Sequence, residues 1–82
     1  MKLYDFYANW CGPCKVMHPI IDEFGEKHPD LEIQKVNAEE DSELCEKFGV
    51  RNLPTFVVED GDTIRKHTGA LSLQSLENFV YA

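Results

Sequence analysis

Strand-like and helix-like segments alternate along this chain, and their order restricts the possible folds more than any other feature of the sequence. Residues 2–8 (KLYDFYA) are predicted to form a buried strand, because they are aromatic and almost continuously apolar. Residues 31–36 (LEIQKV) alternate between apolar and polar side chains, which is typical of a strand with one polar face. Residues 54–68 contain two further strand-like runs joined at Asp60–Gly61, a strong hairpin signal.

Three helices are predicted between and after these strands. The first is expected from Cys11 to about Lys27, because apolar side chains recur there four residues apart. These side chains are Val16, Met17, Ile20, Ile21 and Phe24. Residues 41–49 form a short second helix and residues 72–80 a third, which Ser72 is expected to cap. The order β-α-β-α-β-β-α predicts an α/β fold in which a four-stranded mixed sheet is flanked by helices on both faces.

Size and charge limit the number of domains and the class of partner. A chain of 82 residues is expected to form one domain over residues 1–82. Its 15 acidic and 8 basic residues give a net charge of −7, which argues against nucleic acid or an anionic membrane as a partner. No apolar run approaches the ~20 residues of a membrane span, and the start MKLYDFY lacks the apolar segment of a signal peptide. We therefore expect a cytoplasmic monomer.

Cys11 and Cys14 lie three residues apart at the predicted start of the long helix. This spacing places both side chains on one helix face, with Cα atoms within the roughly 4.4–6.8 Å that a disulfide tolerates. Unpaired N–H groups at a helix N-terminus stabilise a thiolate and so favour a nucleophilic cysteine. Pro13 suits the first helical turn, where its missing N–H is not needed, and Gly12 leaves the approach to Cys11 open. The pattern predicts a pair that alternates between dithiol and disulfide.

A zinc site is the alternative interpretation of these cysteines. Cys11, Cys14 and His18 could supply three ligands, with Cys45 or His67 as the fourth. The proline suits a helix start better than the tight turn of a zinc knuckle, and a second CxxC is missing. The redox pair is therefore preferred, and neither a metal ion nor another cofactor is expected.

With these features in view, the chain resembles thioredoxins over nearly its whole length. The matching motifs are DFYANWCGPCK at 5–15, Pro19, KVN at 35–37, GVRNLPTFVV at 49–58, DG at 60–61 and TGALS at 68–72. A typical thioredoxin has one more strand and helix before the first of these motifs, so we expect a short form that lacks both and leaves the 31–36 strand at a sheet edge. Three further departures are Tyr7 in place of a tryptophan, Glu39 in place of an aspartate, and the extra Cys45.

The resemblance implies a protein-disulfide reductase with a thioredoxin-reductase-type electron donor. Cys11 would be the exposed nucleophile that forms a mixed disulfide with the substrate protein. Cys14 would then attack the Cys11 sulfur and release the reduced substrate. Asp5 matches a buried aspartate that helps to take the proton of the second cysteine, and Lys35 matches its partner lysine. The alternative for Asp5 is a carboxylate bonded to the backbone near a strand end.

The resemblance also implies a set of substrate-binding residues around the cysteines. These are Trp10, Gly12, Pro13, Leu53, Pro54, Gly69 and Ala70. Pro54 matches the cis-proline of the family, which would leave the Leu53 backbone free to pair with an extended substrate. The alternatives are an ordinary proline at a strand start, simple packing for Trp10 and a turn at Gly69. Cys45 is expected to be a small buried apolar residue, with regulatory oxidation as the alternative.

Two other functions are also compatible with the sequence. One is a glutaredoxin-like oxidoreductase that is reduced by glutathione. The other is a non-catalytic thioredoxin-fold subunit whose surface, rather than its thiols, serves a partner. The CGPC and Leu-Pro-Thr motifs favour the disulfide reductase over both.

Overall fold

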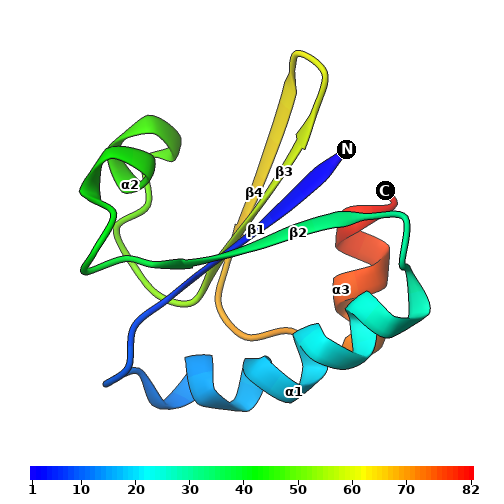
Figure 1. Ribbon diagram of the computed structural model, residues 1–82, viewed down its shortest axis with the longest axis horizontal. Helices are drawn as coiled ribbons and strands as arrows, with labels where there is room; N and C mark the ends of the chain where they lie inside the picture. Colours follow the sequence, from blue (N-terminus) through cyan, green and yellow to red (C-terminus); the bar gives the residue numbers. More distant parts are fainter.

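The computed structural model describes residues 1–82 and has the predicted order of strands and helices. The elements are β1 (Lys2–Tyr7), α1 (Gly12–Lys27), β2 (Glu32–Asn37), α2 (Ser42–Phe48), β3 (Thr55–Asp60), β4 (Thr63–Thr68) and α3 (Leu73–Val80). Helices α1 and α3 lie on one side of the sheet and α2 lies on the other (Figure 1). The α/β fold with a mixed sheet between helices is therefore confirmed. None of the helices combines the length and the apolar character that a membrane span requires.

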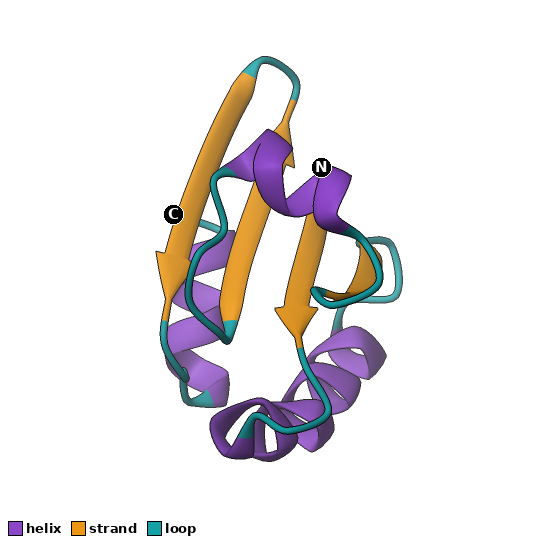
Figure 2. Ribbon diagram, turned by 90° about the vertical axis from the view of Figure 1, so that its left-hand side faces the viewer, coloured by secondary structure: helices purple, strands orange, loops and turns teal.

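The sheet has the strand order β2-β1-β3-β4, so β1 is an inner strand and β2 lies at an edge, as predicted. Strand β1 runs parallel to β2 and antiparallel to β3, and β3 and β4 form the antiparallel hairpin. Because β1 and β3 are antiparallel, the end of β1 meets the start of β3. Figure 2 shows this end of the sheet opposite the turn between β3 and β4. The segment that joins β1 to α1, which leads into the CGPC motif, therefore lies beside the segment that enters β3.

Two apolar clusters hold the layers together, one on each face of the sheet. The larger joins β1 and β3 to α1 and α3, and its members are Leu3, Met17, Ile21, Phe24, Phe56, Val58, Leu76 and Val80. The smaller joins the sheet to α2, and its members are Tyr4, Phe6, Val36, Phe48 and Val57. Val16 fits the four-residue apolar spacing of α1 but does not join the core, because the residue is 61% exposed. The buried row instead begins at Cys14 and continues through Met17, since the helix turns its Val16 side toward solvent.

The ends of the short helices follow the capping residues in the sequence. The Asp41 carboxylate accepts a hydrogen bond from the Leu44 amide at 3.1 Å at the start of α2. Gly49 ends this helix in a left-handed conformation with φ 65°, which glycine adopts without a steric penalty. The hairpin turn differs from the prediction by one residue. Asp60 and Thr63 are paired, so the turn consists of Gly61 and Asp62, with φ 60° at the glycine.

Candidate active site

Cys11 and Cys14 form a disulfide at the start of α1, with their Cα atoms 5.2 Å apart. Cys11 is the N-cap residue of the helix, and its sulfur accepts a hydrogen bond from the Cys14 amide at 3.3 Å. The pair packs against Ala8, with the partly buried side chains of Tyr7 and Leu53 around it. This arrangement places one sulfur at the positive end of the helix, where a thiolate is stabilised.

The expectation that Cys11 is exposed does not describe this oxidised state. Cys11 is only 5% exposed and Cys14 is 1% exposed. Their sulfurs are bonded to each other, and the pair is packed with Ala8, Tyr7 and Leu53. Cys11 is nevertheless the more accessible of the two, and the residues beside it are open to solvent. Gly12 and Pro13 are exposed, and no atom lies within 4 Å of the position that a Gly12 side chain would occupy.

The segment before β3 lies against the cysteine pair. The Leu53 side chain packs onto the cluster of Ala8 and the two cysteines, and the Leu53–Pro54 peptide bond is cis. No hydrogen bond within the protein uses the backbone N–H or C=O of Leu53. The Pro54 carbonyl accepts a hydrogen bond from the Gly69 amide at 2.8 Å, and this bond holds the Gly69 loop next to Pro54. The structure thus brings three predicted rim positions together beside the disulfide.

Two further rim residues are open to solvent. Trp10, directly before Cys11, is 69% exposed, which does not fit the alternative of simple packing. Ala70 is also exposed, next to Gly69. Gly69 has φ 112°, a conformation that favours glycine. The turn at this position therefore requires a glycine, in addition to the place of Gly69 on the rim.

Asp5 lies in the middle of β1 and is 1% exposed. Its neighbours along the same face of the strand are Leu3 and Tyr7, which places its carboxyl group under α1. The buried Oδ2 atom has no hydrogen-bond partner, and this disfavours the alternative of a carboxylate bonded to the backbone. Burial raises the pKa of Asp5 to about 6, because the charged form loses its hydration. The positive charges of His18 and then Lys35 lower this pKa by smaller amounts.

Lys35 lies opposite Asp5 in the register of β1 and β2, but the two residues do not form an ion pair. The Lys35 ammonium group instead donates a hydrogen bond to Asp22 of α1 at 2.8 Å. This contact lowers the pKa of the exposed Asp22 carboxyl. The lysine therefore acts on Asp5 only from a distance, since its charge is largely balanced by a nearer carboxylate.

His18 and Asp22 near Asp5 were not assigned to the redox site from the sequence. Their spacing contains a signal, because Cys14, His18 and Asp22 follow one another at intervals of four residues along α1. The zinc alternative does not fit the fold. Cys45 belongs to α2, across the sheet from α1, and no group of three or more His, Cys, Asp or Glu side chains is arranged to hold a metal ion.

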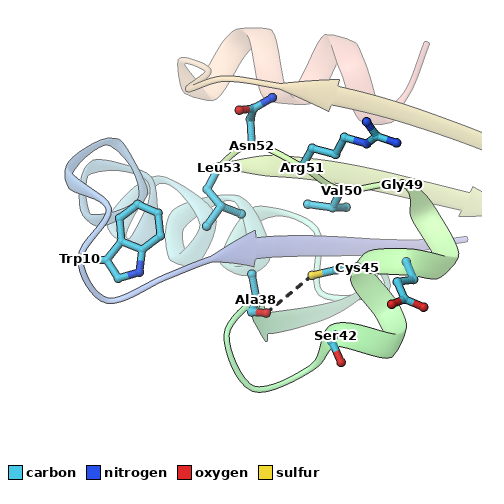
Figure 3. A pocket seen from close by; sticks show the side chains of 10 residues that line it. Trp10, Ala38, Ser42, Cys45, Gly49, Val50, Arg51, Asn52 and Leu53 are labelled. Atoms are coloured by element: carbon cyan, nitrogen blue, oxygen red, sulfur yellow. Dashed lines mark hydrogen bonds between the residues drawn. The ribbon is translucent and has the colours of Figure 1, made fainter.

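A groove of about 700 Å³ begins at Trp10 and Leu53 and continues toward α2 (Figure 3). Cys45 lies in its wall, and its thiol donates a weak hydrogen bond to the Ala38 carbonyl at 3.8 Å. The side chain is half-buried and not fully buried as predicted, because the groove leaves one side of it open. Partial burial raises the pKa of the Cys45 thiol, and the nearby Asp41 charge adds to this effect.

Comparisons with known proteins agree with this geometry. The thioredoxin family model matches residues 1–82. Thioredoxin 1 of Synechococcus elongatus is 35% identical over 78 residues, which cover 93% of this chain and 73% of that protein. Thioredoxin of Bacillus subtilis is 36% identical over 80 residues, which cover 95% of this chain and 77% of that protein. The crystal structure of oxidised mitochondrial thioredoxin 3 from Saccharomyces cerevisiae superposes with a TM-score of 0.87 at 36% identity, covering 98% of this chain and 76% of the other.

Proposed function

This chain belongs to the thioredoxin family and is a thiol–disulfide oxidoreductase, and from this we propose that it reduces disulfide bonds in other proteins. The observation that carries the proposal is the Cys11–Cys14 disulfide at the N-terminus of α1, which is the oxidised product of such a reaction. We further propose that the protein acts as a monomer with a single domain over residues 1–82. A reducing compartment such as the cytoplasm suits its free Cys45 thiol.

The first step belongs to Cys11 in the reduced protein. Its thiolate, at the positive end of α1, attacks one sulfur of the substrate disulfide. A new bond forms between Cys11 and that sulfur, and the other substrate sulfur leaves as a thiolate that takes a proton from solvent. Two observations support this choice of nucleophile. Cys11 is the more accessible cysteine, and exposed residues adjoin it on both sides.

The second step requires the deeper cysteine to lose its proton. We assign this proton to the Asp5 carboxylate, because Asp5 is buried behind α1 and its oxygen has no other partner. The Cys14 thiolate then attacks the Cys11 sulfur, and the second substrate sulfur leaves as a thiolate. The substrate has gained two electrons and the protein has lost two, in the form of the disulfide that the structure contains.

Substrate docking is assigned to the rim around the disulfide. The Leu53 backbone has its N–H and C=O groups free, so an extended substrate segment can add to it as a short strand. Trp10, Gly69 and Ala70 border the same opening with apolar or small surfaces. This arrangement favours polypeptides over small thiols as substrates, because backbone pairing needs an extended chain on either side of the disulfide.

A turnover assay with two electron donors tests the proposal. One arm supplies NADPH with a thioredoxin reductase and the other supplies NADPH with glutathione and glutathione reductase, each with insulin as the disulfide substrate. We expect turnover in the first arm to be about tenfold or more above the second, with none in either arm for Cys11→Ser. Faster turnover with glutathione would instead identify a glutaredoxin-like enzyme. No turnover in either arm, with biological function retained when both cysteines are replaced by serine, would identify a non-catalytic subunit.

A further inference from the structure

Four ionisable side chains lie near one another where α1 packs beside β1 and β2. Asp5 comes from β1, Lys35 from β2, and His18 and Asp22 from successive turns of α1. Asp5 and Lys35 are paired across the two parallel strands, and Lys35 and Asp22 join β2 to the helix at 2.8 Å. Only Asp5 is fully buried, so it is the member of this cluster whose ionisation depends most on its neighbours.

His18 is held in place on the side of α1 that faces β1. Its ring contacts the Tyr7 ring edge-on, with ring centroids 5.1 Å apart and planes at 79°. Tyr7 lies two residues after Asp5 and therefore projects from the same face of β1. His18 also lies one turn after Cys14. The half-buried imidazole is thereby fixed above the strand that carries Asp5, close to the cysteine whose proton Asp5 is proposed to take.

The two cations near Asp5 are not equivalent. The Lys35 ammonium group is paired with Asp22, whose negative charge opposes it. His18 forms no ion pair, although its charge also acts on Asp22, and its positive charge has a larger effect on the Asp5 carboxyl than that of Lys35. A histidine side chain is also the one cation that ordinarily gains and loses its charge between pH 5 and 8.

The residues that pack on this cluster from β3 and α3 are apolar, and Glu26 is a further charged residue at its edge. The cluster face of β3 contributes the apolar side chains of Phe56 and Val58, and α3 contributes Leu76 and Val80. Glu26, one turn beyond Asp22, borders the same shallow hollow as Lys35. The Tyr7 ring contacts His18, and Cys14 lies one turn before His18 on α1; the Tyr7 hydroxyl and the Cys14 thiol are both neutral when protonated.

We propose that His18 is a positioning residue for the second step, in which its protonated imidazole holds Asp5 in the carboxylate form that can accept the Cys14 proton. This inference rests on the proposed function. The proton passes from the Cys14 thiol to Asp5 and leaves Asp5 for solvent once the disulfide has closed. His18 raises the fraction of Asp5 that is ionised, and it forms no bond with the substrate.

Direct titration of Asp5 tests the electrostatic part. In oxidised, ¹³C-labelled protein, the carboxyl carbon of Asp5 is followed by NMR from pH 4 to 9. In His18→Gln the midpoint should rise by about 0.5 pH units or more, a change of about threefold in the ratio of carboxylate to carboxylic acid near pH 6. His18→Lys, which keeps a positive charge at every pH, should hold the midpoint at or below the wild-type value. His28→Gln is the matched control, because His28 pairs with Glu77 at the other end of α1. It should leave the midpoint unchanged.

Stopped-flow kinetics tests the functional part. Reduced protein is mixed with less than one equivalent of 5,5′-dithiobis(2-nitrobenzoic acid), which expels one coloured thiolate when Cys11 attacks and a second when Cys14 closes the disulfide. The rate of the second release should fall at acidic pH. The pH at which it falls should be higher in His18→Gln than in the wild type, and it should be close to the wild-type value in His18→Lys. A structural role alone would move both substitutions in the same direction.

The outcomes separate the two proposals. The role of His18 is overturned, and the proposed function is kept, if the wild type shows normal second release and His18→Gln changes neither the Asp5 titration midpoint nor the pH at which the second release slows. That role is also overturned if the lysine variant behaves like the glutamine variant. A wild-type protein that expels no second thiolate at any pH overturns the proposed function, and this inference with it.

Discussion

Replacing Asp5 by asparagine should stabilise the folded protein at neutral pH. The carboxyl group is 1% exposed on an inner strand, and its Oδ2 atom has no hydrogen-bond partner. A buried carboxylate without partners is costly, whereas a neutral amide of the same shape avoids the charge. The substitution therefore removes a penalty that the native protein carries whenever Asp5 is ionised.

The sign and size of the effect follow from proton linkage. The pKa of Asp5 rises from 3.8 to about 6 on folding, so between these values the native protein binds a proton that the unfolded chain has released. The stability associated with this proton is fully present below pH 3.8 and is lost as the pH rises through 6. The loss is on the order of 3 kcal/mol. Asp5→Asn has no group that ionises at this position and therefore does not lose this stability. The difference in the free energy of unfolding between the two proteins should grow from pH 4 to 6 and stay constant above pH 6.

Urea denaturation of the oxidised proteins, followed by far-UV circular dichroism from pH 3.5 to 8, measures this difference. Circular dichroism is preferred because the single tryptophan, Trp10, is already exposed in the folded state. Asp22→Asn is the control of opposite sign. The pKa of Asp22 is lowered by Lys35, so this variant should lose stability at neutral pH and regain the wild-type value in acid. A pH-independent difference for Asp5→Asn, or lower stability than wild type at pH 7, would show that burial of the Asp5 charge carries no such penalty.

Three further predictions concern single side chains. Asp5→Asn should slow the second thiolate release at pH 7 by about tenfold or more, because Cys14 loses its proton acceptor; a wild-type rate would contradict this. Cys45→Ala should cost about 1 kcal/mol or less in urea denaturation and leave both release rates unchanged, and a disulfide at Cys45 in the oxidised protein would disprove this. Lys66→Met should cost about 1 kcal/mol, because its ammonium group donates to the Phe48 and Gly49 carbonyls at 3.0 Å and so caps α2; an unaltered urea midpoint would contradict the capping role.

The sequence predicts the fold well because its local signals agree with one another. Ser72 caps α3 as expected, Asp41 and Gly49 cap the two ends of α2, and the order of the elements permits few sheet arrangements. Two local errors have a common cause. Val16 fits an apolar spacing of four but lies on the solvent side, and the hairpin turn is shifted to Gly61–Asp62. Both depend on the rotation or register of an element, which tertiary packing decides.

The cysteine pair of the candidate site was predictable from the sequence, but the contacts around it were less so. The motifs locate Cys11 and Cys14, and the structure adds that both are covered in the oxidised state. Lys35 lies opposite Asp5, as the motif implies, yet it pairs with Asp22. This difference depends on the distance between α1 and β2, which cannot be predicted from the spacing of residues along the chain.

Trapping of the mixed disulfide is the sharpest test of which cysteine attacks the substrate. Cys14→Ser protein is reduced, incubated with a disulfide-containing substrate protein and analysed by mass spectrometry after proteolysis. We predict a stable mixed disulfide through Cys11, because the residue that resolves it is missing. Cys11→Ser protein should form none under the same conditions. A mixed disulfide that forms through Cys14 in Cys11→Ser, with none through Cys11 in Cys14→Ser, would contradict the assignment and reverse the two roles.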